Sequence, residues 1–238
     1  MKAATTGEAA CDIEWGIANE SSASLHIRYP PGELIYQAET YAAGIYIIVC
    51  GLVSDHHAMQ SGGHRSPVLE ILGPGDLIGL DTLLERPANL HLTSARAITE
   101  VALRFFERDV FQQILCDQPA VCRRYLDYLN YRFHALKKST SPAIVSSSEA
   151  RLCSLLLRLA QRFGEPHESG STLLPTGIST ERLPELLGIS RRRVRNILAC
   201  LPEVRQAGER LIISVEALQR WLAGDRGPAP IHPRAFPR

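Results

Sequence analysis

The hydrophobic pattern of the chain changes period near residue 106, and this change constrains the fold more than any other feature. From about Leu25 to Arg104, short apolar runs alternate with turns rich in glycine and proline, such as Pro30-Pro31-Gly32 and Gly73-Pro74-Gly75-Asp76. Beyond Phe106, apolar residues recur every three or four positions, which is typical of amphipathic helices. Strands followed by helices predict an α+β chain whose N-terminal part is a β-sandwich or jelly-roll barrel.

Two segments of this N-terminal part are especially informative. Ile45–Val49 is rich in β-branched and aromatic residues and predicts a buried strand. Residues 61–64 (SGGH) predict a hairpin tip between the strands Leu52–Met59 and Val68–Leu72. The first 23 residues are small and polar apart from an isolated Trp15, so we expect a loosely held arm there.

A long helix is predicted from Pro119 to about Lys138, because proline is well suited to a first helical turn. Five of its residues follow the 4-3-4-3 spacing of a heptad seam: Cys122, Leu126, Leu129, Phe133 and Leu136. Two interpretations stay open. The seam packs against the chain's own barrel, or it forms the contact between the two helices of a homodimer, which its flanking cations favour.

Composition shifts and turn signals divide the chain into six parts. The segment STSPAIVSSS, with its serines and proline, predicts the linker between two domains. The predicted parts are an arm at 1–23, a β-roll domain at 24–112, a dimerisation helix at 113–138, a linker at 139–148, a helical domain at 149–224 and a frayed tail at 225–238.

Charge is distributed unevenly between the two halves of the chain. Residues 1–148 carry 12 Lys and Arg against 16 Asp and Glu, a net charge of −4. Residues 149–238 carry 14 cations, all arginines, against 9 acids, a net charge of +5. An arginine-rich half suggests an anionic partner, with nucleic acid as the leading candidate.

Residues 178–201 have the spacing of a helix-turn-helix motif. Leu183, Leu186 and Leu187 would form the inner face of a first short helix, and Gly188 the turn. Ser190 would cap a second helix whose inner face is Val194, Ile197 and Leu198. Residues 204–214 then predict a β-hairpin wing with its tip at 208–210. A proline at position 184 would limit the first helix to little more than one regular turn.

The outer face of the second helix carries four arginines within five positions. A solvated arginine face is the plain alternative, but guanidinium groups that repel one another indicate a surface that meets DNA. We expect Arg191, Arg192 and Asn196 to read base edges. The residues expected to hold phosphates are Ser179, Ser190, Arg193, Arg195, Arg205 and Arg210.

Several segments, taken in order, resemble the Crp/Fnr transcription regulators, the superfamily of the cyclic-AMP receptor protein. They are PPGELIYQAETYAAGIYIIVCGLV (30–53), GPGDLIGLDTLL (73–84), the long helix 119–138 and ISTERLPELLGISRRRVRNIL (178–198). The resemblance spans about residues 25–222. It implies a cyclic-nucleotide-binding-like β-roll, a homodimer on the long helix, and a C-terminal winged helix-turn-helix that binds a two-fold DNA site.

The sequence departs from this family at the residues that hold cyclic AMP. Members that bind it carry Gly-Glu-Leu in the effector cassette, followed by Arg-Ser, for the ribose hydroxyl and the cyclic phosphate. Here the cassette reads Gly79-Leu80-Asp81, and the Arg-Ser place reads Pro87-Ala88-Asn89-Leu90-His91. We therefore expect a degenerate cassette (Gly79, Leu80, Asp81, Asn89, Leu90) and a signal other than a cyclic nucleotide. At the second position of the recognition helix, Arg192 replaces the familiar Glu, which predicts an unusual half-site.

Other cofactors are constrained by the cysteines and histidines. Only Cys11 lies in the N-terminal region, so that region cannot supply a four-cysteine iron–sulfur cluster. A haem-sensing role, known in one branch of the family, stays open through Cys50, His57, His91 or His134. His56, His57 and His64 surround one predicted hairpin but lack the spacing of a cupin metal site, so no metal site is predicted and the histidines are expected to be solvent-exposed.

We therefore predict a cytoplasmic, homodimeric, sequence-specific DNA-binding transcription regulator, not an enzyme. Its partners would be double-stranded DNA, a second copy of the chain, and RNA polymerase if it activates transcription. No membrane is expected, since the longest apolar run, Ile45 to Val53, is about half of the ~20 residues that a span requires. The alternatives are a cupin-like metal-binding barrel enzyme and a constitutive DNA-binding regulator without a ligand.

Overall fold

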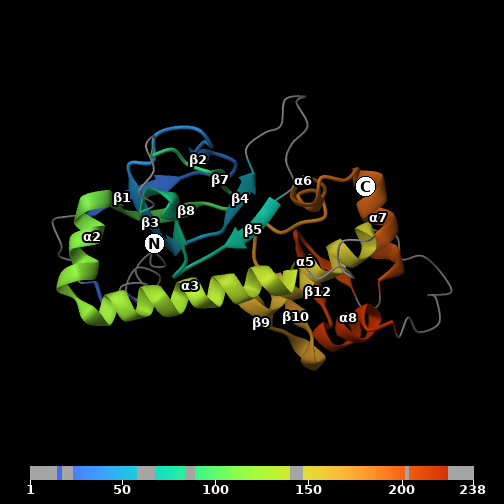
Figure 1. Cartoon of the computed structure of the whole chain (residues 1–238). Helices are drawn as coiled ribbons and strands as arrows, with labels where there is room; N and C mark the ends of the chain where they lie inside the picture. Colours follow the sequence, from blue (N-terminus) through green and yellow to red (C-terminus); the bar gives the residue numbers. More distant parts are fainter. Residues whose placement is uncertain are drawn as a thin grey trace, which may run out of the picture. The chain divides into compact units, whose positions relative to one another are not determined.

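The computed structural model describes residues 15–17, 24–57, 68–83, 89–139, 147–201 and 204–224. The chain divides into two compact units, residues 1–136 and residues 137–238. An N-terminal β-rich unit and a C-terminal mainly helical unit confirm the α+β prediction (Figure 1).

The N-terminal unit is built on two four-stranded antiparallel sheets, in the orders β1-β8-β3-β6 and β2-β7-β4-β5. Its strands are β1 (Ser24–Tyr29), β2 (Leu34–Tyr36), β3 (Gly44–Cys50), β4 (Val53–His57), β5 (Val68–Leu72), β6 (Leu77–Ile78), β7 (Thr93–Ala97) and β8 (Val101–Glu107). The predicted strand at 45–49 and the pairing of β4 with β5 are confirmed. The predicted hairpin tip at 61–64 lies outside the described residues.

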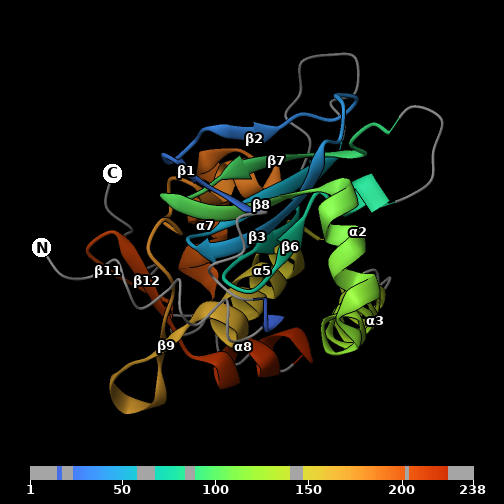
Figure 2. The same cartoon turned by 90° about the vertical axis from the view of Figure 1, so that its left-hand side faces the viewer.

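Strand β3 is a nearly continuous apolar run because it contributes side chains to two apolar clusters. One cluster includes Ile48, Val53, Leu72 and Leu103 from strands of both sheets. The other joins Ile45 and Ile47 of β3 to the helices that follow the strands. Because β3 contributes to both clusters, its two faces are buried and no polar alternation is required. Figure 2 shows β3 beside β8 and β6, its neighbours in the sheet.

Two helices follow the last strand of this unit: α2 (Arg108–Asp117) and α3 (Pro119–Ser139). The predicted dimerisation helix at 113–138 is therefore wrong at its start, since residues 113–117 belong to α2. The chain leaves helical geometry at Gln118, with φ −121° and ψ 88°, and Pro119 begins the next helix. A first-turn residue donates no intrahelical hydrogen bond, so proline costs nothing there.

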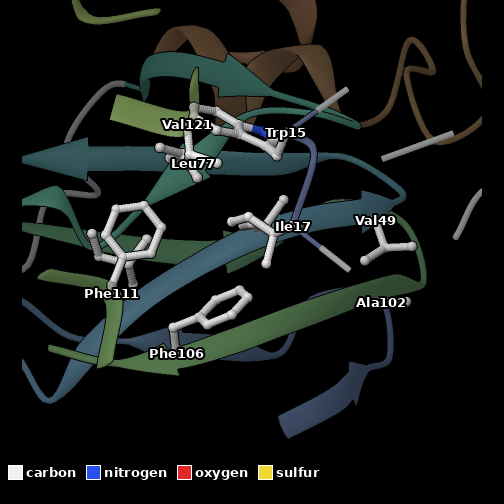
Figure 3. Close-up of a cluster of buried hydrophobic side chains, with 10 residues drawn as sticks. Trp15, Ile17, Val49, Leu77, Ala102, Phe106, Phe111 and Val121 are labelled. Carbon is white, nitrogen blue, oxygen red and sulfur yellow. The ribbon is translucent and has the colours of Figure 1, made fainter. Parts of the chain in front are cut away.

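The predicted loose arm is also corrected. Trp15 and Ile17 are 4% and 2% exposed and belong to the apolar cluster beside α2 and α3. Figure 3 shows both side chains among Leu77, Phe106 and Phe111. The indole N–H of Trp15 donates to the Gly75 carbonyl at 2.9 Å. The rest of the 1–23 segment lies outside the described residues.

The C-terminal unit combines helices with a small antiparallel sheet of order β11-β12-β10-β9. Its elements are α5 (Ser148–Phe163), β9 (Glu165–Pro166), η2 (Glu168–Gly170), β10 (Thr172–Leu173), α6 (Leu183–Leu187), α7 (Arg191–Cys200), β11 (Arg205–Ala207), β12 (Arg210–Ile213) and α8 (Val215–Leu222). Helix α5 packs against α6, α7 and α8 through its leucines, of which Leu152 and Leu156 are fully buried.

The predicted linker at 139–148 is bounded by helices on both sides. Helix α3 continues to Ser139, and α5 begins at Ser148 with Ser147 as its N-cap. The Ser147 hydroxyl accepts from the Ala150 N–H at 3.1 Å. Residues 140–146, like the tail at 225–238, lie outside the described residues.

Candidate nucleic-acid interface and effector cassette

The helix-turn-helix geometry predicted for residues 178–201 is present. Helices α6 and α7 pack together, and Gly188 joins them in the left-handed region at φ 65° and ψ 32°. A side chain at that conformation would be strained, so glycine suits this turn. The predicted inner faces are buried on both helices: Leu183, Leu186, Leu187, Val194, Ile197 and Leu198.

Helix α6 is only five residues long, as the proline at position 184 predicted. Ser179, which we expect to hold a phosphate at the start of this helix, lies four residues before its first regular residue, Leu183. The turn nevertheless starts at Ser179, because its carbonyl accepts from the N–H groups of Arg182 and Leu183 at 3.0 and 3.1 Å. The Ser179 side chain is half-buried, which makes it a poorer phosphate ligand than expected.

Helix α7 presents the arginine face that the sequence predicted. Arg191, Arg192, Arg195 and Asn196 are all exposed, opposite the buried inner face. Ser190 is the N-cap, and its hydroxyl accepts from the Arg193 N–H at 3.2 Å. That contact fixes the start of the helix and leaves the hydroxyl proton of Ser190 free to donate to a phosphate.

Arg193 already has a partner within its own unit. Its guanidinium lies 2.8 Å from a carboxylate oxygen of Glu149, in the first turn of α5. Both side chains are partly exposed, so the pair is weak enough for a phosphate to replace the carboxylate. Arg193 is therefore less available than Arg195, a distinction that the sequence did not predict.

The wing is present as the hairpin β11–β12, in which Ala207 pairs with Arg210 across Gly208 and Glu209. Arg205 is exposed on β11 and fits its predicted phosphate role. Arg210 does not. Its Nε donates to the Leu174 carbonyl at 2.7 Å and its terminal nitrogen lies 2.9 Å from Glu165, whose carboxyl pKa is lowered by the hydrogen bond to this arginine. Arg210 therefore fastens the wing to β9 and β10 rather than reaching outward.

The seam predicted on α3 is partly exposed in the single chain. Leu126 and Phe133 are 58% and 54% exposed, whereas Cys122 and Leu129 are half-buried. The side chain of Leu136 lies outside the described part. A different face of α3, including Val121, Tyr125 and Tyr128, packs against the β-rich unit. The alternative in which the seam itself packs against the barrel is therefore wrong for Leu126 and Phe133.

The predicted cassette lies between β6 and the short helix η1 (Leu80–Leu83). Gly79 has φ 76°, and its N–H donates to the Tyr36 hydroxyl at 3.1 Å. A Cβ at Gly79 would lie 2.8 Å from the Gly44 carbonyl oxygen, so this glycine also permits close backbone packing. The Asp81 carboxylate accepts from the Leu92 N–H at 3.0 Å.

The second half of the cassette is described only in part. Asn89 adopts an unusual positive φ of 40°, and Leu90 is 38% exposed in an isolated bridge with Tyr41. Residues 84–88, which include Pro87 and Ala88 from the place where the family's Arg-Ser would fall, lie outside the described residues. Neither Leu80 nor Leu90 offers a side chain that could accept from a ribose or bind a phosphate.

A group of polar residues that the sequence reading missed lies inside the β-rich unit. Asp55 is largely buried and hydrogen-bonds with Thr93. Desolvation raises the pKa of the Asp55 carboxyl to about 6. Glu70 forms an ion pair with Arg132 of α3 at 2.5 Å. The strand pattern could have indicated Asp55 and Glu70, since each lies two positions from a buried apolar residue on one strand.

The histidines occupy different environments, and the prediction that they are solvent-exposed does not hold for the hairpin histidine whose side chain is described. His56 lies half-buried with its ring nitrogen 2.9 Å from the Ser54 hydroxyl. His91, one of the haem candidates, is 3% exposed and stacks on Tyr36 with ring centroids 3.9 Å apart. The His57 side chain and all of His64 are outside the described part. Among the described residues, no group of three or more His, Cys, Asp or Glu is placed to hold a metal ion.

Comparison with known proteins places this geometry in context. Residues 26–117 match the family model of the cyclic nucleotide-binding domain. The CRP-like cAMP-activated global transcriptional regulator of Mycobacterium tuberculosis is 27% identical over 191 residues, which cover 79% of this chain and 83% of that protein. A cyclic nucleotide-binding domain therefore spans residues 26–117, and over most of its length the chain is similar to CRP-like regulators. The chain is also 28% identical to the HTH-type transcriptional regulator Cmr of M. tuberculosis, over 71% of the chain and 63% of that protein.

Solved structures of the Crp/Fnr family share the fold. FixK2 from Bradyrhizobium japonicum matches with a TM-score of 0.66 and 20% identity, over 83% of this chain and 96% of that one. The c-di-GMP responsive global regulator CLP of Xanthomonas campestris matches with a TM-score of 0.66 and 19% identity, over 86% and 98%. Both curated relatives are named as transcriptional regulators. Within the described residues, no helix is both long and apolar enough to cross a membrane.

Proposed function

We propose that this protein is a sequence-specific DNA-binding transcription regulator of the Crp/Fnr type. The observation that carries the proposal is the exposed face of α7, where Arg191, Arg192, Arg195 and Asn196 project from a helix held by a helix-turn-helix core. In this motif the N-terminal part of the second helix enters the major groove. Arginine can donate two hydrogen bonds to guanine O6 and N7, and asparagine can pair with adenine.

The proposed regulator is a homodimer on α3. Leu126 and Phe133 are large apolar side chains that a single chain leaves more than half exposed. Burying such a stripe against a second α3 is favourable and places two helix-turn-helix motifs on a two-fold DNA site. If the protein activates transcription, RNA polymerase is a further partner.

The proposed signal is not a cyclic nucleotide. Leu80 occupies the place of the glutamate that would accept from a ribose hydroxyl, and the cassette N–H of Gly79 is already hydrogen-bonded to Tyr36. Asp81, immediately after Leu80, places a carboxylate where an anionic phosphate would be repelled. The alternative of a constitutive regulator makes the same DNA contacts without any ligand.

The DNA-binding proposal is tested by selecting bound sequences from a random pool with wild-type protein and with Arg192→Glu. An arginine donates to guanine, whereas a glutamate accepts from cytosine N4. We expect the same two-fold motif from both proteins, with one position per half-site changed from guanine to cytosine. Recovery of no motif from wild-type protein, or of an unchanged motif from the variant, would contradict the proposal.

The dimer is tested by sedimentation of Phe133→Asp and Leu129→Lys. A charge in the seam finds no water there, so both variants should sediment as monomers with folded β-rich units. The matched control is Tyr131→Asp on the same helix, which removes an exposed aromatic residue outside the heptad positions and should stay dimeric. Dimeric seam variants would mean that another surface joins the two copies.

A further inference from the structure

A polar cluster replaces the apolar core at one end of the β2-β7-β4-β5 sheet. On β4, Asp55 lies on the same strand face as Val53, and on β5, Glu70 lies on the same face as Leu72. Val53 and Leu72 are both fully buried in the core between the two sheets. Thr93 likewise continues the face of Ala95 on β7. Along these three neighbouring strands the inward face therefore changes from apolar to polar.

Other elements supply the rest of this cluster. Arg132 arrives from α3, Asp81 from the effector cassette, and His91 from the segment before β7. Tyr36 connects them, because it stacks on His91, hydrogen-bonds with Thr93 and lies within electrostatic range of Asp55 and Asp81. We call the set Asp55, Glu70, Asp81, His91, Thr93 and Arg132 the polar cluster.

The cation of the polar cluster is already engaged. Arg132 pairs with Glu70 at 2.5 Å, and its other terminal nitrogen donates to the Leu77 carbonyl at 3.2 Å and contacts the Tyr128 hydroxyl. Burial opposes its charge, but Tyr128 and Glu70 together raise the pKa of the guanidinium. Arg132 and Glu70 therefore balance each other, and the carboxylate of Asp55 lies beside this pair.

Two buried atoms of the polar cluster have no hydrogen-bond partner. One is Oδ1 of Asp55, and the other is Nδ1 of His91, whose side chain is only 2% exposed. The nearest carboxylate oxygen to that nitrogen is Oδ2 of Asp81, at 3.8 Å, which is too long for a hydrogen bond. Unsatisfied buried polar atoms are costly, so two of them beside one cassette indicate a site that a ligand completes.

We propose that the polar cluster binds an organic cation, an amine, amidine or guanidine, whose N–H groups donate to Asp55. Such a ligand supplies N–H donors for the buried Asp55 oxygen that has no hydrogen-bond partner, together with a positive charge for its carboxylate. A cyclic nucleotide would bring a phosphate anion beside Asp55 and Asp81 instead. The inference rests on the proposed function, because it names the chemical class of the signal that the β-rich unit receives.

The test is calorimetric titration of the full-length protein with agmatine and with benzamidine, at pH 7.5 and physiological salt. Cyclic AMP and inorganic phosphate are titrated in parallel as anionic probes. We expect at least one of the two cations to bind, and to bind at least tenfold more weakly to Asp55→Asn. The control is Glu100→Gln, which removes a carboxylate that is 71% exposed on the same unit and should leave the affinity unchanged.

Wild-type protein provides a second readout that needs no variant. Lowering the pH from 7.5 to 5 protonates Asp55, so cation affinity should fall at least fivefold; the groups that face Asp55 from the neighbouring elements are Thr93, Arg132, Glu70 and Asp81. Binding of neither cation, equal binding to Asp55→Asn, or tighter binding of cyclic AMP than of both cations would overturn the inference. So would a response to Mg²⁺ or Zn²⁺ alone.

DNA affinity measured on the same samples separates this inference from the proposed function. Cation binding without DNA binding would support the cation site and contradict the proposed DNA-binding function. DNA binding without cation binding would support the proposed function and contradict the cation site. If both hold, adding the cation should change the affinity for the selected DNA, and Asp55→Asn should abolish that change.

Discussion

Arg104 in the N-terminal unit and the arginines at the start of α7 in the C-terminal unit lie in opposite environments. In the N-terminal unit, Arg104 is 1% exposed, donates to the Ile17 carbonyl and the Ser24 hydroxyl at 3.0 Å each, and lies over the Phe106 ring. In the C-terminal unit, Arg191 and Arg192 on α7 are exposed. A guanidinium enclosed by partners stabilises the fold, whereas one directed at solvent is available to an anion from outside.

Two arginines of the C-terminal unit lie between these extremes. Arg210 contacts Leu174 and Glu165, so it stabilises the fold of its own unit as Arg104 does in the N-terminal unit. Arg193 is paired with Glu149 but stays half-exposed. Residue type and position on a motif therefore do not by themselves assign a DNA contact to an arginine. The partners of each guanidinium in the free protein must also be known.

The largest expected effect is on folding. Arg104→Ala removes a buried side chain that fastens the Ile17 segment to β1 and β8 and leaves a cavity. We expect the free energy of unfolding to fall by about 3 kcal/mol in urea titrations. The matched change Arg205→Ala on the exposed wing should cost less than about 0.5 kcal/mol. Equal losses in the two variants would erase the contrast between the units.

The buried carboxylate of the N-terminal unit gives the next effect, which depends on pH. Burial raises the pKa of Asp55 to about 6 in the folded state, above the 3.8 of an ordinary aspartate. The folded state therefore keeps this proton while the unfolded state loses it, and stability falls as the pH rises through this window. Groups that also act on Asp55 are Thr93, Arg132, Glu70 and Asp81.

Asp55→Asn removes this penalty. Relative to wild type, the variant should gain about 2–3 kcal/mol of unfolding free energy between pH 4 and pH 7, since one pKa unit corresponds to about 1.4 kcal/mol. Urea titrations of both proteins at several pH values measure the difference. A difference that stays constant with pH would show that Asp55 ionises normally in the folded protein.

For the exposed arginines of α7, Arg191→Ala and Arg195→Ala should change DNA binding in different ways. Arg191→Ala should cost about 1–3 kcal/mol on the selected operator and relax the preference at one base pair. Arg195→Ala should weaken all sequences about equally, because we expect Arg195 to meet the sugar–phosphate backbone. A panel of operators with single base-pair changes, titrated by fluorescence anisotropy, distinguishes the two patterns. Uniform weakening by both variants would mean that α7 does not enter the groove as proposed.

The smallest expected effect concerns Arg193, which is paired with Glu149 but half-exposed. Glu149→Gln releases Arg193 from its ion pair, so DNA affinity should increase about two- to fivefold, as expected for loss of a competing exposed pair. Glu216→Gln breaks a similar exposed pair with Arg220 on α8 and serves as the control for the lost negative charge. An equal increase in both variants would assign the gain to net charge rather than to Arg193.

Features encoded by local periodicity were predictable from the sequence. The strand at 45–49, the helix beginning at Pro119, the capped start of α7 and the inner faces of both helices of the motif all depend on spacings within about ten residues. The five-residue length of α6 also followed from one proline. These elements arise from backbone geometry and amphipathicity, which neighbouring residues determine.

What the sequence could not provide depends on contacts between distant positions. The sequence predicts a loose arm around Trp15, since its hydrogen-bond partner, Gly75, lies 60 residues away and cannot be read from the local sequence. The sequence likewise predicts a phosphate contact for Arg210, since its carbonyl partner, Leu174, is 36 residues distant. Asp55 and Glu70 become neighbours only through the pairing of β4 with β5. No single-sequence pattern encodes such partners, and they decide which charged groups are free to bind DNA or a ligand.

The most direct test of the account is the salt dependence of DNA affinity. Each phosphate neutralised by the protein contributes about −0.9 to the slope of log K against log salt. The wild-type protein should show a steep negative slope between dilute and physiological buffer. Arg195→Ala should reduce its magnitude by about one per half-site, whereas Arg210→Ala should leave it unchanged. A flat wild-type response, or an equal change in both variants, would contradict the claim that the exposed arginines of α7 meet the DNA backbone.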